Sequence, residues 1–94
     1  MSRRRFDHLL VEVSVAAGSR IPRYDLWLRI HEAGSDPEEL TSWATVAFCD
    51  GPLAGFLAER GLQLSPTAKR RLRRAVKRYD PDLPSPEEVL FGTS

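Results

Sequence analysis

A dense run of positive charge is the feature of this sequence most able to do chemistry. Residues 65–79 contain seven lysines and arginines and no acidic residue. Ser65-Pro66 supplies a capping side chain followed by the residue that a first helical turn tolerates, and Asp80-Pro81 should end the helix. We therefore predict a helix over 66–79.

This helix should be strongly two-sided. At 100° per residue, one arc of about 100° holds its apolar positions, which are Ala68, Leu72, Ala75, Val76 and Tyr79. The cations lie outside that arc and are called the basic face: Arg70, Arg73, Arg74 and Lys77 opposite the apolar arc, with Lys69, Arg71 and Arg78 on its flanks.

The basic face should bind something negatively charged. Several of its cations are spaced i, i+4, where like charges cost a few tenths of a kcal/mol instead of gaining as much from an acid–base pair. An external anion would compensate, and nucleic acid phosphates are the favoured partner, with an acidic protein surface as the other choice. We expect the contacts to come from Arg70, Arg73, Arg74 and Lys77, with Lys69 and Arg78 beside them. No aromatic residue is interleaved on the basic side, which argues against a stacking platform for single strands.

Three alternatives to this interpretation remain open. The acidic tail (Asp80, Asp82, Glu87, Glu88) could fold back and neutralise the face internally, or the face could simply be solvated. The chain could instead be a protein-interaction or assembly module without nucleic-acid binding. In that case either the basic face or Val89, Leu90 and Phe91, which a capping box at Ser85 should place on a short helix, would dock on a partner. A homo-oligomer is also possible.

Other candidate sites are weaker. Cys49 beside Asp50 could be a nucleophile with His8 or His31 as its base, but a small buried thiol is the commoner case. The spacing of Ala47, Gly51 and Leu57 matches three positions of a helix-turn-helix, whereas Asp50 and Pro52 fall where that motif needs apolar packing.

No acid, base or nucleophile converges with another on a common face, and no Cys/His spacing resembles a zinc site. We therefore predict a non-enzymatic binding protein with no cofactor, no metal and no small-molecule substrate.

Composition limits the class of protein. The chain has 94 residues, 41% hydrophobic and 29% charged, as expected for one globular domain. Residues 1–64 carry 7 basic and 9 acidic groups and the tail carries four acids, so the net charge of +1 conceals the basic run.

One cysteine and no long apolar run favour a cytoplasmic protein without a membrane span. Residues 2–6 fit a twin-arginine export signal, but Glu12 interrupts the apolar stretch that should follow.

The predicted fold is all-α, a compact single-domain bundle of four to six short helices. Residues 1–20 form an N-terminal arm and an uncertain first element, and residues 21–94 form the helical domain, with a Pro-rich acidic tail from about 80. Over 6–17, alternating valines suggest a strand while a stripe from Phe6 to Ala17 favours a helix.

Later helices should cover 22–33, the most central of them, then about 38–50, then 53–60 with Gly61 as cap. The first turn of the helix over 38–50 could be separate, because Thr41 or Ser42 offers a second start. The expected core is Trp27, Leu28, Ile30, Leu40, Trp43, Ala47, Phe48, Phe56, Leu57, Leu72 and Val76.

Overall fold

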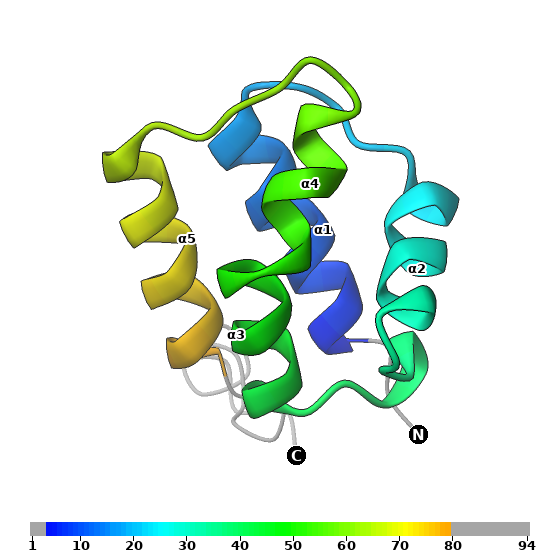
Figure 1. The fold of residues 1–94 in the computed structure, drawn as a ribbon. Coiled ribbons are helices and arrows are strands. Elements are labelled where there is room, and N and C mark those ends of the chain that lie inside the picture. The colour runs from blue at the N-terminus through cyan, green and yellow to red at the C-terminus, as the bar shows by residue number, and fades with distance from the viewer. Residues whose placement is uncertain (1–3, 80–94) are drawn as a thin grey trace, which may run out of the picture.

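The protein is an all-α bundle and forms a single domain. The computed structural model describes residues 4–79, and no strand occurs among them. Five α-helices and one 3₁₀ turn follow in chain order (Figure 1): α1 Arg4–Ala17, α2 Arg23–Glu32, η1 Pro37–Glu39, α3 Ser42–Asp50, α4 Pro52–Ala58 and α5 Pro66–Arg78. The predicted fold class is confirmed.

The helical interpretation of the first element is also confirmed. Phe6, Leu9 and Val13 are buried in the core, while Val11 and Val15, which a strand would have placed with Val13, are exposed. In Figure 1 α1 runs through the middle of the bundle between α5 and α2. The segment in which a strand period competed with a helical one thus supplies the centre of the fold.

The prediction that the second helix would be the central one is wrong. α2 lies at the edge of the bundle (Figure 1), with Leu26 and Ile30 buried and Trp27 and Leu28 only half-buried. The rings of Tyr24, Trp27 and His31 stack in series along its outer side, with centroid separations of 6.4 and 5.4 Å. Stacking on the surface satisfies these apolar rings without placing them in the core.

The third helix begins later than the main prediction and turns a different side inward. Thr41 Oγ1 accepts the Ala44 amide at 3.0 Å, which starts α3 at Ser42 and leaves η1 as a separate first turn. Thr45, Phe48 and Cys49 face the core. Trp43 and Ala47 were expected in the core and are exposed, Trp43 by 81%.

A buried hydroxyl explains that correction. Thr45 Oγ1 donates to the Thr41 carbonyl at 2.7 Å, so its only strong donor is satisfied inside the helix. A threonine with its hydroxyl bonded this way can be buried at little cost. The core therefore accepts Thr45 and excludes Trp43.

The fourth helix follows after a single residue and ends as predicted. Gly51 separates α3 from α4, and Leu53, Phe56 and Leu57 are buried. Gly61 has a φ of +72°, the left-handed conformation that glycine adopts without strain. The Leu62 amide donates to the Leu57 carbonyl at 2.9 Å, which closes the helix end and sends the chain towards α5.

None of the helices in residues 4–79 has both the length and the apolar character that crossing a bilayer requires.

Candidate functional site

The helix that carries the basic face is anchored at both ends. Ser65 Oγ accepts the Ala68 amide at 3.0 Å, the predicted N-cap. Leu72 and Val76 are buried, and α5 packs on α1 and α3. At the far end Tyr79 stacks on His8 of α1 with a centroid separation of 4.1 Å. Arg5 Nη1 also donates to the Tyr79 carbonyl at 3.3 Å.

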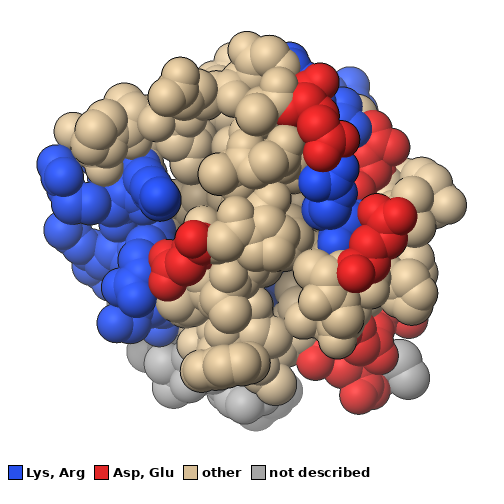
Figure 2. All heavy atoms as spheres, viewed as in Figure 1, with Lys and Arg blue, Asp and Glu red and all other residues tan. Residues whose placement is uncertain are grey.

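The apolar arc packs inward as predicted, and every cation of the basic face is exposed. Figure 2 shows lysine and arginine atoms gathered in one patch over α5, whereas blue and red groups alternate over the other side of the molecule. A shallow groove in the patch is lined entirely by cations: Arg70, Arg73, Arg74, Lys77 and Arg78. Five of the six predicted contact residues, Arg70, Arg73, Arg74, Lys77 and Arg78, therefore share one surface, while Lys69 lines a different pocket.

Among residues 4–79, a carboxylate pairs with only one cation of the basic face. Arg73 Nε donates to Asp50 Oδ1 at 3.0 Å and to Oδ2 at 3.2 Å. Both side chains are about half exposed, so solvent screens this pair and it contributes little stability. The other six cations of α5 have no ion pair within the described part of the chain.

The arginines of α2 and of the turn after α4 behave differently. Arg23 pairs with Asp7, Arg29 with Glu59 at 2.7 Å, and Arg60 with Asp25. The pKa of Arg29 is raised, first by its hydrogen bond to Glu59 and then by nearby carboxylates, against desolvation. Within residues 4–79, three arginines of α2 and the turn after α4 are thus paired with acids, whereas six of the seven cations of α5 are not.

Two of the predictions fall outside the described residues. The acidic tail that could neutralise the basic face begins at Asp80, and the proposed docking residues Val89, Leu90 and Phe91 lie beyond it. Both stay predictions.

The structure brings an aromatic ring to the basic face that the sequence of α5 does not contain. A groove between α3 and α5 is lined on the α5 side by Arg73 and Lys77 and on the α3 side by Ser42, Trp43, Val46, Ala47 and Asp50. Arg73 and Lys77 also line the all-cation groove, so the two hollows adjoin. The expectation that no aromatic residue accompanies the cations is correct for the basic side of α5 itself, but it is wrong for the folded surface, where Trp43 of α3 lies beside Arg73 and Lys77.

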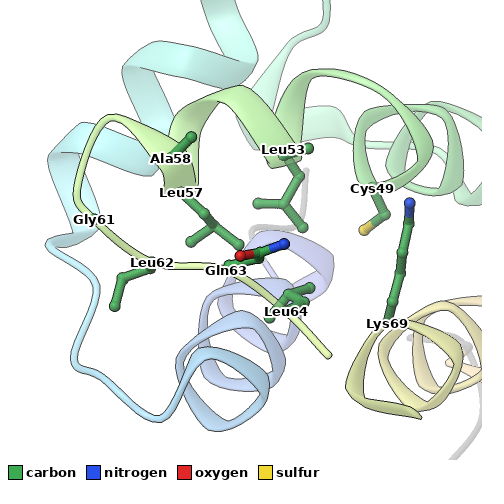
Figure 3. A pocket seen from close by; sticks show the side chains of 10 residues that line it. Cys49, Leu53, Leu57, Ala58, Gly61, Leu62, Gln63, Leu64 and Lys69 are labelled. Atoms are coloured by element: carbon green, nitrogen blue, oxygen red, sulfur yellow. The ribbon is translucent and has the colours of Figure 1, made fainter. Parts of the chain in front are cut away.

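A second pocket lies between α4, the 61–64 segment and the start of α5 (Figure 3). In Figure 3 Cys49 and Lys69 stand at one end, and Gly61 and Leu62 stand at the other. Burial raises the pKa of the Cys49 thiol to about 12, with a smaller contribution from Asp50. The predicted buried thiol is confirmed. No histidine or carboxylate lines the pocket to act as its base.

The histidines are placed elsewhere. His8 stacks on Tyr79, and its pKa is lowered chiefly by desolvation, which outweighs the attraction of Glu12. His31 stacks on Trp27 at the surface of α2. Within residues 4–79, no cluster of three or more potential metal ligands is present.

The helix-turn-helix spacing has no counterpart in the fold. α3 and α4 are separated by Gly51 alone, whereas the turn of that motif needs three or four residues to set its helices at a steep angle. The matching positions Ala47, Gly51 and Leu57 instead belong to two helices that follow one another directly.

Comparisons with known proteins identified no matching family model, no similar curated protein and no similar solved structure.

Proposed function

We propose that this protein binds nucleic acid non-enzymatically through the basic face of α5, with Arg70, Arg73, Arg74 and Lys77 making the central phosphate contacts. The observation that supports this most is the contrast in ion pairing: Arg23, Arg29 and Arg60 have carboxylate partners, while six of the seven cations of α5 have none among residues 4–79. Arg70, Arg74 and Lys77 are available to phosphates without first breaking an ion pair within residues 4–79, whereas Arg73 must exchange or share its pair with Asp50.

The all-cation groove also suits a polyanion better than a single anion. Its arginines recur along more than two turns of α5, so successive phosphates of one strand can each find a guanidinium. Each phosphate neutralised releases counterions, and binding should weaken steeply with salt. If all six unmatched cations are engaged, the slope of log K against log salt should approach about −4 for a single strand.

The test is a fluorescence anisotropy titration of a labelled oligonucleotide at salt concentrations from about 0.05 to about 0.2 M, the range over which phosphate contacts change affinity strongly. A variant with Arg70, Arg73, Arg74 and Lys77 all changed to Gln should lose binding, and its salt slope should fall by about 2, because three of the four are unmatched cations. This variant should keep its fold, because it removes like-charge repulsion from α5. Equal retention of wild type and variant on single-stranded and duplex nucleic acid at low salt would refute the proposal.

A charge-matched control distinguishes the effect of the basic face on binding from the effect of net charge. Arg20, Arg23, Arg29 and Arg60 lie outside α5, and changing these four to Gln alters the net charge by the same amount. The control should bind nearly as well as wild type, provided that circular dichroism shows both variants folded. If the control loses as much binding as the α5 variant, the basic face is not the site.

An acidic protein surface is the other partner that the basic face could serve. A cytoplasmic setting would suit either partner and agrees with the single buried thiol. Purification from native lysate with and without nuclease distinguishes them, because a nucleic-acid partner disappears on nuclease treatment and a directly bound protein stays.

A further inference from the structure

An exposed tryptophan stands beside the basic face. Trp43 is the second residue of α3 and is 81% exposed, although burial of such a ring would ordinarily contribute several kcal/mol to folding. Thr45, Phe48 and Cys49 hold the opposite side of α3 in the core, so the orientation of the helix fixes Trp43 outward. The ring is therefore available on a rigid support.

The other tryptophan provides a contrast within the same chain. Trp27 is half-buried and stacks on Tyr24 and His31 along α2. No ring of residues 4–79 stacks on Trp43. The indole face of Trp43 is therefore available for stacking, whereas that of Trp27 is covered by its neighbours.

The chemistry around Trp43 specifies what would stack on it. Arg73 and Lys77, which are i, i+4 on α5, form the opposite wall of the groove that Trp43 lines, and they also line the adjoining all-cation groove. Asp50 lines the first groove too and pairs with Arg73, so the two cations exceed the one carboxylate there. An occupant that satisfies both walls needs a planar ring for the indole and negative charge for the cations. A nucleotide of a polymer has both, joined through its sugar.

The pairing of ring and cation also distinguishes single strands from duplexes. In a duplex the base faces are covered by their stacked neighbours and only phosphates are available to a surface such as this one. An unpaired base can leave the stack and lie on an aromatic side chain while its phosphates follow a positively charged groove.

We infer that Trp43 stacks on an unpaired base of single-stranded nucleic acid whose flanking phosphates lie on Arg73 and Lys77. This inference rests on the proposed function and makes it more specific, since it selects single strands over duplexes at the same surface. In this arrangement the nucleic acid backbone runs along α5, and the stacked base lies on the side of α5 that faces α3.

Trp43 reports its own contact. In a Trp27→Phe protein the remaining indole is Trp43, and titration with oligo(dT) or oligo(U) should quench its fluorescence, while a duplex of equal length should not. Quenching by either oligonucleotide supports stacking, and a difference between them reflects the sugar together with the C5-methyl group that thymine carries and uracil lacks.

Affinity provides the second readout. Trp43→Leu should weaken single-strand binding by roughly 5- to 150-fold, the range expected for loss of one base–aromatic stack, and should change duplex binding less than about twofold. Trp43→Phe should restore part of the loss. Tyr24→Leu is the matched control, because Tyr24 is an exposed aromatic residue on α2, away from α5, and its loss should not affect binding.

The outcomes separate this inference from the proposed function. If single strands and duplexes bind alike, depend on the basic face, and are unaffected by Trp43→Leu, the stacking inference is overturned and the proposed function stands. If Trp43→Leu weakens both forms equally in a folded protein, stacking on an unpaired base is likewise overturned. If wild type binds no nucleic acid even at low salt, both proposals fall.

Discussion

Asp50 is the residue whose removal should strengthen binding. Its carboxylate holds Arg73 through two hydrogen bonds from Nε and is the only carboxylate paired with the basic face among residues 4–79. Asp50→Asn removes one negative charge from the groove beside Trp43 and frees one guanidinium for phosphate. Counting ion pairs within residues 4–79 alone, the unmatched cations on α5 rise from six to seven.

The size of the effect follows from counterion release. One additional phosphate contact steepens the slope of log K against log salt by about 0.7 for a single strand, so affinity should rise about 8-fold at 0.05 M salt and about 3-fold at 0.2 M. Stability should change little, because the pair is half exposed. Asp50 also sits at the C-terminal end of α3, where a negative charge opposes the helix dipole.

Anisotropy titrations of one labelled oligonucleotide at both salt concentrations measure this directly. Asp25→Asn is the matched control, since it also removes a carboxylate and frees an arginine, Arg60, but Asp25 lies on α2, at the opposite edge of the bundle from α5 (Figure 1). Weaker or unchanged binding by Asp50→Asn would refute the reasoning. An equal gain from Asp25→Asn would also refute it, by showing that total charge and not the basic face governs affinity.

Three further predictions concern the fold that supports the face. Leu72→Ala should lower the free energy of unfolding by about 2–5 kcal/mol because its side chain is 2% exposed, whereas Trp43→Ala should stay within about 0.5 kcal/mol; urea denaturation tests both. The lowered pKa of His8 means that the folded state disfavours its proton, so stability should fall as pH drops below the ordinary histidine value of 6.5. Thermal melts from pH 7.5 to about 5.5, chosen to bracket that value, should show a loss that His8→Gln reduces, and an identical loss in the variant would contradict the assignment. Cys49, with its pKa raised to about 12, should react with a thiol reagent far more slowly in the folded protein than in urea at pH 7, and equal rates would contradict its burial.

Local signals in the sequence predicted α5 and its two sides because each of them acts within a few residues. The Ser65 cap, the apolar arc around Leu72 and Val76, and the outward cations are all present in the structure. The same holds for the left-handed Gly61 and for the separate first turn before α3.

Trp43 could not be placed correctly from the sequence. In a helix of nine residues, two stripes rotated from one another contain similar numbers of apolar side chains, and the wrong one contains the larger ring. What decides between them is the hydrogen bond from Thr45 Oγ1 to the Thr41 carbonyl, which makes a polar residue acceptable in the core. The position of Trp43 beside Arg73 then depends on how α3 packs on α5, a long-range contact that periodicity does not encode.

The most direct test of the central claim is a map of the amide and indole NMR signals of the labelled protein as a single-stranded oligonucleotide is added. The account predicts shifts concentrated in α5 between Lys69 and Arg78, together with the Trp43 indole, that shrink when salt is raised. Shifts confined to the stacked rings of α2, or no shifts at low salt, would contradict it.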